Sequence, residues 1–141
     1  MRVQFSAMNT QPQSAGPAPK VLVVDDNEDA ADSLATLLGV MGYSVRTAYD
    51  GPEGIEAADE FQPAVALLDI GLPRLSGYDI ARHLREHRGG DVLLVAITGW
   101  GQEDDRRRAR EAGFDHHFTK PADFGALLEL IDRELKDRAP H

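Results

Sequence analysis

The chain has 141 residues, of which 42% are hydrophobic and 28% are charged, and its formal net charge is −9. This length suits one domain with its own core, and it is too short for two. So negative a chain repels nucleic-acid phosphates and anionic lipids, and the absence of cysteine excludes disulfides, thiolate metal sites and cysteine nucleophiles. Its apolar runs are shorter than the ~20 residues of a membrane helix. We therefore expect a cytoplasmic protein that binds neither membranes nor nucleic acid.

The first 19 residues have a different composition from the rest. They combine Gln, Ser, Ala and Gly with three prolines, and they show neither helix nor strand periodicity. Such a segment offers little apolar area to offset the entropy cost of ordering it. We expect residues 1–19 to be a flexible tail or linker and residues 20–138 to form the folded domain.

From Lys20 onward, short apolar runs alternate with segments of helical periodicity. The runs that predict strands are 21–24, 43–48, 64–68, 92–97 and 115–119. The first helix is predicted from apolar residues at helical spacing, namely Ala30, Leu34, Leu37, Leu38 and Met41. Further helices are expected from Pro52, over 77–87, over 102–112 and from Phe124. Five strands that alternate with five helices predict an α/β fold, a doubly wound parallel sheet covered on both faces.

Polar residues follow the predicted strands at the edge where such sheets bind ligands. Asp25 and Asp26 follow the first strand, Asp69 the third, Thr98 the fourth and Lys120 the fifth. Three neighbouring carboxylates repel one another unless a cation lies among them, and Mg²⁺ prefers such oxygen ligands. A lysine and a hydroxyl suit a phosphoryl group, which leaves one carboxylate as the nucleophile. These strand ends therefore point to phosphoryl transfer onto an aspartate.

Four motifs in this order resemble the receiver domain of bacterial two-component response regulators. They are Val23-Val24-Asp25-Asp26-Asn27, Leu67-Leu68-Asp69 with Leu72-Pro73 and Gly77, Thr98-Gly99, and Lys120-Pro121. The resemblance extends from Lys20 to about Lys136. It implies a flavodoxin-like (βα)5 fold with the strand order 2-1-3-4-5.

The resemblance also assigns the metal and the acceptor. Asp69 would be the phosphoacceptor, and Mg²⁺, with Mn²⁺ as a substitute, would be the cofactor. The side chains of Asp26 and Asp69 would bind this ion directly. Asp25 would bind it mostly through water, and Gly71 would supply a backbone carbonyl.

Two further residues would contact the phosphoryl oxygens, namely Thr98 and Lys120, and the Lys120-Pro121 bond is expected to be cis. His117 stands where receivers usually carry a tyrosine or phenylalanine that changes rotamer on phosphorylation. We therefore expect Thr98 and His117 to form the switch. The signalling surface would lie around the fourth helix, the fifth strand and the fifth helix.

The resemblance implies a signalling domain and not an enzyme. Its phosphodonor would be a histidine kinase or a histidine phosphotransfer protein, and its output an unknown downstream protein, with phosphorylation-dependent dimerisation as a further expectation. We expect a single-domain regulator without a DNA-binding output, because only a short polar segment follows Leu135. A receiver domain excised from a hybrid histidine kinase is the alternative.

Two alternatives belong to other classes. An aspartate-nucleophile phosphatase of the haloacid dehalogenase type needs a second aspartate two residues after the nucleophile, where this chain has Gly71. A flavodoxin-like nucleotide binder needs a glycine-rich loop after the first strand, where this chain has acidic residues.

Two clusters also have a purely structural interpretation. Asp25 and Asp26 could cap the first helix at its positive dipole end. His83 and His87 lie four residues apart on one helical face, as in some metal sites. The sequence shows no third ligand for this histidine pair, so a solvated helix face is the better interpretation.

Overall fold

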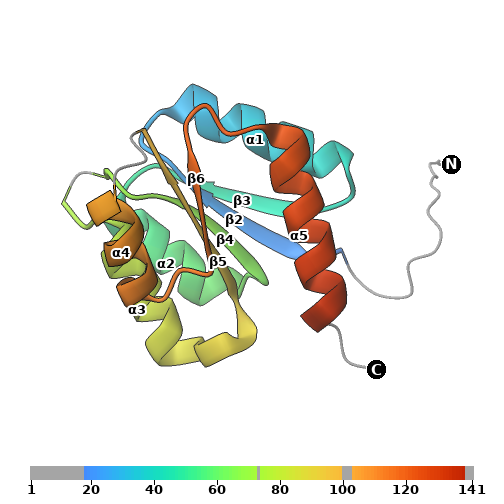
Figure 1. Ribbon diagram of the computed structural model, residues 1–141. Helices are drawn as coiled ribbons and strands as arrows, with labels where there is room; N and C mark the ends of the chain where they lie inside the picture. The colour runs from blue at the N-terminus through green and yellow to red at the C-terminus, as the bar shows by residue number, and fades with distance from the viewer. Residues whose placement is uncertain (1–17, 73, 100–102, 139–141) are drawn as a thin grey trace, which may run out of the picture.

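The computed structural model describes residues 18–72, 74–99 and 103–138 (Figure 1). Most of the predicted tail, residues 1–17, lies outside these ranges. The described strands are β2 (Lys20–Val24), β3 (Ser44–Ala48), β4 (Val65–Asp69), β5 (Leu93–Thr98) and β6 (His116–Thr119). The described helices are α1 (Glu28–Val40), α2 (Gly51–Phe61), α3 (Gly77–Arg88), the 3-10 helix η1 (Gly89–Asp91), α4 (Glu103–Ala112) and α5 (Phe124–Arg138).

These strands form one parallel sheet in the order β3-β2-β4-β5-β6. Counted along the chain, this is the order 2-1-3-4-5, so the expected flavodoxin-like topology is confirmed. The order reverses between β2 and β4, and open sheets of this kind bind ligands there, at the carboxyl ends of the strands.

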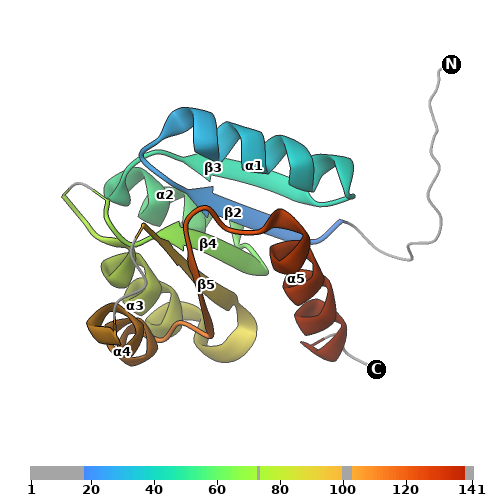
Figure 2. The same ribbon diagram turned by 45° about the horizontal axis from the view of Figure 1, so that its top comes forward.

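Helices cover both faces of the sheet (Figure 2). Helices α1 and α5 pack on one face, and α2, α3 and α4 pack on the other. Strand β2 shows how the alternation of side chains supplies both cores, because Val21 and Val23 face α1 and α5 while Leu22 and Val24 face α2 and α3. All four are at most 2% exposed, which explains the continuous apolar run in the sequence.

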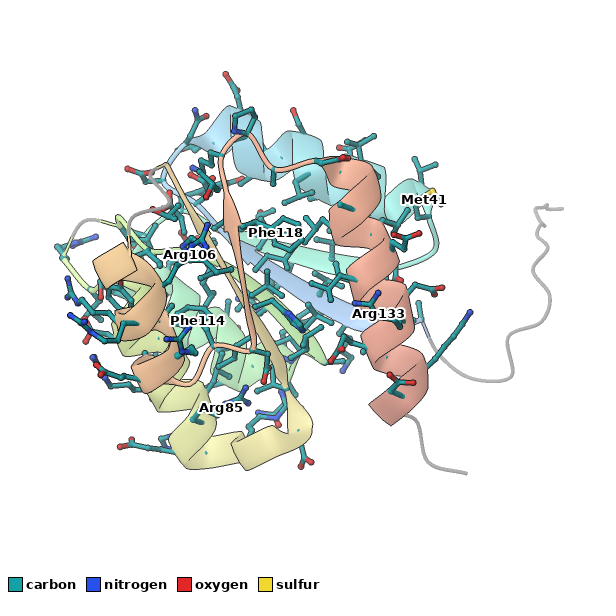
Figure 3. The ribbon with its side chains drawn as sticks, in the orientation of Figure 1. Met41, Arg85, Arg106, Phe114, Phe118 and Arg133 are labelled. Carbon is teal, nitrogen blue, oxygen red and sulfur yellow. The ribbon has the colours of Figure 1, made fainter. Side chains whose placement is uncertain are left out.

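Helix α1 corrects one detail of the sequence analysis. Its buried residues are Ala31 and Leu38, whereas Leu37 is 46% exposed and Met41 is 52% exposed. Figure 3 shows Met41 at the far end of α1. The apolar residues of this helix span a wider arc than the sheet covers, so their spacing alone does not fix which of them are buried.

The cap of α1 decides between two interpretations of the acidic pair. The side chain of Asn27 accepts a hydrogen bond from the backbone N–H of Ala30, so Asn27 is the N-cap. Asp25 instead accepts a hydrogen bond from Asn27 N. The carboxylates of Asp25 and Asp26 are therefore not needed as helix caps. Among the described residues, no helix is long and apolar enough to cross a bilayer.

Candidate functional site

Three carboxylates meet at the topological switch point. Val24 and Leu68 are register partners in β2 and β4, so the residues that follow them, Asp25 and Asp69, lie side by side. One oxygen from each of Asp25, Asp26 and Asp69 lies within 4.8 Å of the other two. Asp25 and Asp69 are buried, while Asp26 is exposed. A close set of carboxylate oxygens open to solvent on one side fits Mg²⁺, which keeps part of its water shell.

Lys120, which follows β6 and is far from the carboxylates in sequence, completes this cluster. Its Nζ donates to Asp25 Oδ2 at 3.0 Å and to Asp69 Oδ2 at 3.2 Å. Its backbone N–H donates to Thr98 O at 2.6 Å, and the Lys120–Pro121 bond is cis, as the resemblance implied. The structure therefore brings Lys120 together with Asp25 and Asp69, because the ammonium group contacts carboxylates that follow β2 and end β4.

The protonation of the cluster follows from burial and charge together. Burial raises the pKa of Asp69, and the charge of Asp25 adds to this, against the opposing effects of the Gly71 hydrogen bond and Lys120. Burial works to lower the pKa of Lys120, but its hydrogen bonds and charge interactions with Asp25 and Asp69 outweigh it, and the pKa is raised. Lys120 is therefore a stable cation at neutral pH, and Asp69 ionises less readily than an exposed aspartate.

The loop after Asp69 packs tightly against the end of β4. Gly71 N donates to Asp69 Oδ1 at 2.9 Å, and Gly77 N donates to Ile70 O at 3.2 Å. A Cβ on Gly77 would lie 2.5 Å from Asp69 O and 2.9 Å from the Cα of Ile70. Only glycine fits at this approach, so Gly77 helps to place Asp69.

The two predicted switch residues lie on adjacent strands. Thr98 ends β5, is buried, and is bonded through its carbonyl to Lys120. His117 lies in β6, half-buried, with its Nε2 enclosed. It lines a hollow of about 330 Å³ together with Arg106, Arg110 and Phe114. The structure thus places Thr98 next to Lys120 and His117 on the side of the sheet that α4 covers.

Sequence reasoning missed a groove beside the cluster. This groove, of about 490 Å³, has Asp25 and Lys120 in its polar part, and its apolar wall comes from α1, β5 and the β6–α5 segment. Members of that wall are Leu34, Leu37, Ile97, Phe124 and Leu127. The sequence offered no signal for it, because Ile97 reads equally well as a buried strand residue and the other four as core positions of two amphipathic helices.

The family model of the response regulator receiver domain matches residues 21–132. This chain is a response regulator receiver domain. As a member of this family, the chain is a signalling domain of two-component systems. Membership of the family implies phosphorylation on an aspartate and Mg²⁺ as the cofactor.

Curated relatives and solved structures agree with this. The receiver domain is 32% identical over 125 residues to the "DNA-binding dual master transcriptional regulator RpaA" of Synechocystis, covering 86% of this chain and 52% of the relative. It is 36% identical over 121 residues to the "Transcriptional regulatory protein PrrA" of Mycobacterium bovis, with the same two coverages. It thus spans about half the length of these relatives.

Among solved structures, the CheY-like receiver domain protein of Methanospirillum hungatei JF-1 superposes with a TM-score of 0.81 at 28% identity, covering 86% of this chain and 96% of that one. The BeF3-activated DrrB receiver domain superposes with a TM-score of 0.78 at 30% identity, covering 84% of this chain and 98% of that one. The family model, at residues 21–132, includes the sheet except for its first residue, Lys20, so the fold and the family rest on the same part of the chain.

Proposed function

We propose that this receiver domain, residues 20–138 after a tail of residues 1–19, accepts a phosphoryl group on Asp69. The donor is a phosphohistidine of a histidine kinase or phosphotransfer protein. The observation that carries the proposal is the position of Lys120 Nζ, within hydrogen-bond distance of the carboxylates of both Asp25 and Asp69. A structural ion pair would need one partner, whereas this amine faces the nucleophile and its neighbour.

The chemistry assigned to this chain is nucleophilic. A carboxylate oxygen of Asp69 attacks the phosphorus, and the P–N bond of the donor breaks. The bonding electrons return to the donor imidazole, which leaves with a proton from solvent. Lys120 Nζ and the Thr98 hydroxyl donate to the phosphoryl oxygens, on which negative charge gathers.

The side chains of Asp25, Asp26 and Asp69 and the backbone carbonyl of Gly71 would hold Mg²⁺, or Mn²⁺ in its place. When bound, this ion supplies positive charge against the carboxylates and the phosphoryl oxygens. The 4.8 Å cluster of carboxylate oxygens supports this assignment.

Partner contact and output use different parts of the surface. The apolar groove, which has Asp25 and Lys120 in its polar part, would give the donor protein a docking wall. A change at Thr98 would reach β6 through Lys120, and His117 would pass it to the hollow beside α4. The receiver thus acts as a switch for a downstream protein, and dimerisation on phosphorylation belongs to the same proposal.

The identity of the output stays a prediction. The relatives are named as transcriptional regulators, and the matched region is about half of their length. That this chain binds no nucleic acid is therefore an expectation that rests on its net charge alone. A stand-alone regulator and a receiver of a hybrid kinase use the same Asp69 chemistry.

The test is incubation with acetyl phosphate and Mg²⁺ followed by intact-mass measurement. We expect one adduct of about 80 Da, the mass of one added phosphoryl group. Asp69→Asn should abolish the adduct, and Asp91→Asn, which changes an exposed aspartate in η1, should keep it. An adduct that persists in Asp69→Asn would overturn the assignment of the acceptor.

A further inference from the structure

A hollow of about 330 Å³ lies between α4 and β6, the strand at one edge of the sheet. Its lining includes Phe114, which is only 6% exposed, and the exposed side chains of Arg106 and Arg110. Figure 3 shows Arg106 and Phe114 between α4 and β6. Ligand pockets have volumes of about 300–1,000 Å³, so this hollow has room for a few side chains and not for a folded surface.

Arg106 and Arg110 lack the acidic partners that several other arginines of this chain have. The arginines paired with a carboxylate are Arg46, Arg74, Arg82 and Arg85. Arg108, on the same helix, lies over the ring of Tyr78, 4.6 Å from its centroid. Within the part of the chain that the structure describes, the guanidinium groups of Arg106 and Arg110 form no ion pair and donate no hydrogen bond.

Two carboxylates beside the hollow are already engaged by other groups. Asp115 lines the hollow but pairs with Arg85. Glu134, on α5, lies 3.7 Å from Nε2 of His116. A guanidinium group keeps its charge at every physiological pH, and it binds a carboxylate through two parallel hydrogen bonds. The two arginines on α4 are therefore available to an anionic group of another molecule.

We propose that the hollow binds an extended acidic segment of the downstream protein. Its carboxylates pair with Arg106 and Arg110, and one of its apolar side chains packs against Phe114. Residues four apart on a helix are separated by about 6 Å along its axis. Side chains two apart on one face of an extended chain are separated by about 6.8 Å. Acidic residues at alternate positions of the segment therefore match the spacing of the two guanidinium groups.

The charge of the whole chain favours a short acidic segment over nucleic acid. The formal net charge is −9, although α4 carries four arginines. A nucleic acid extends beyond such a patch and places further phosphates near the negative remainder of the surface. A short segment interacts mainly with charges within the screening length of about 8–10 Å, where the arginines dominate.

The register of the last two strands connects this hollow to the phosphorylation site. Thr98 pairs with Thr119, and Ala96 pairs with His117, which lines the hollow. A displacement of Thr98 on phosphorylation would therefore move the strand that forms one wall of the hollow. The assignment of the acidic segment to the downstream protein rests on the proposed function, whereas the affinity for such a segment does not.

The experiment uses fluorescence anisotropy with a dye-labelled peptide in which glutamates alternate with serines on both sides of one leucine. The full chain is titrated into it, with and without acetyl phosphate and Mg²⁺. We expect saturable binding that weakens as NaCl is added, and binding at least about tenfold weaker for a peptide with glutamine in place of glutamate. Arg106→Gln and Arg110→Gln should each weaken binding about fivefold.

The matched control is Arg82→Gln, at an exposed arginine on α3 that pairs with Asp79, and it should bind the peptide like the wild type. Equal affinity for the glutamate and glutamine peptides, or wild-type affinity in both variants of the α4 arginines, would overturn the inference. Tighter binding of a single-stranded DNA oligonucleotide would assign the hollow to nucleic acid instead. Arginine variants that weaken only self-association would assign it to a second copy of the chain.

Phosphorylation separates this inference from the proposed function. We expect acetyl phosphate to change the peptide affinity of the wild type and not that of Asp69→Asn. The same affinity in the phosphorylated and unphosphorylated wild type would overturn the link between the hollow and the output. A chain that binds the peptide but gains no phosphoryl group would instead contradict the proposed acceptor and leave the hollow's affinity intact. A phosphorylated chain that binds no peptide would contradict only the present inference.

Discussion

The Arg85 guanidinium lies 2.7 Å from the carboxylate of Asp115, which joins α3 to the start of β6. The same Asp115 Oδ2 accepts from Leu94 N at 2.9 Å, and Asp115 N donates to Leu94 O at 2.8 Å. Asp115 is thus bonded to β5 through its side chain and its main chain. Arg85 thereby connects α3 to the edge of the sheet that carries the predicted switch.

The other donors of Arg85 reach three carbonyl oxygens. Nε donates to Gly113 O at 2.9 Å, and Nη1 donates to Gly89 O at 2.6 Å and to Val92 O at 2.8 Å. Figure 3 shows Arg85 among the segments that connect α3, β5 and β6. These carbonyls lie outside the strands, in the segments that follow α3 and α4, and one planar cation contacts all of them at once.

We expect Arg85→Lys to lower the free energy of unfolding by about 2–3 kcal/mol, since a lysine cannot reproduce the planar fork of donors. Urea denaturation measures the loss. Arg82→Lys is the matched control on the same helix, where an exposed pair with Asp79 contributes about 0.5 kcal/mol or less. Equal effects of the two substitutions would show that Arg85 does not hold these turns.

Gly77→Ala should destabilise the domain by about 1–3 kcal/mol, because the added Cβ would meet the backbone of Asp69 and Ile70. It should also slow phosphorylation, since the clash displaces the acceptor. Gly39→Ala is the opposite case, with nothing within 4 Å of the added Cβ. In α1 it should stabilise the domain by about 0.5–1 kcal/mol. Thermal unfolding of both variants checks the contrast, which would fail if they changed Tm in the same direction.

Asp69→Asn should stabilise the Mg²⁺-depleted domain at pH 7 by roughly 1 kcal/mol. Burial raises the pKa of Asp69, so the folded state binds this proton more tightly than the unfolded state does. The contribution of Asp69 to stability is therefore lost as pH rises from about 4 through the raised pKa, and asparagine carries no such penalty.

The excess in the free energy of unfolding of Asp69→Asn over the wild type should shrink as pH falls toward about 4. Urea denaturation in the presence of a chelator, at several pH values, measures the difference. Asp91→Asn, at an exposed position, should show no such trend. A pH-independent difference between Asp69→Asn and the wild type would contradict the assigned direction of the pKa shift.

Lys120→Met should slow phosphorylation by acetyl phosphate about 100-fold, because the donor to the phosphoryl oxygens is lost. Lys120→Arg keeps the charge but presents a broad fork where a compact ammonium contacts Asp25 and Asp69, so we expect a partial loss. Lys136→Met, which removes an exposed lysine paired with Asp132 on α5, is the control and should leave the rate unchanged. Adduct formation over time, followed by mass spectrometry, measures all three rates.

The sequence predicted the sheet and the cluster well because both depend on local signals. Apolar runs locate the strands, and the parallel topology then brings their carboxyl ends to one edge, where Asp25, Asp69 and Lys120 meet. The prediction of which residues of α1 are buried was less accurate, because apolar residues such as Leu37 occupy positions that the sheet does not cover.

Contacts between distant segments could not be predicted in the same way. The pairing of Asp59 with His83 depends on how α2 packs on α3, and neither residue has a neighbour in sequence that indicates it. The carbonyl partners of Arg85 are likewise invisible in sequence, because every residue carries a carbonyl and only the fold decides which ones face the guanidinium.

Lys120 lies 95 residues beyond Asp25 and 51 beyond Asp69, and it follows the strand at the outer edge of the sheet. During synthesis, the acids therefore leave the ribosome long before the amine does. Phosphorylation at its full rate would therefore need the strand before Lys120 to be in place, so a nascent chain that has not yet reached Lys120 would be a poor acceptor.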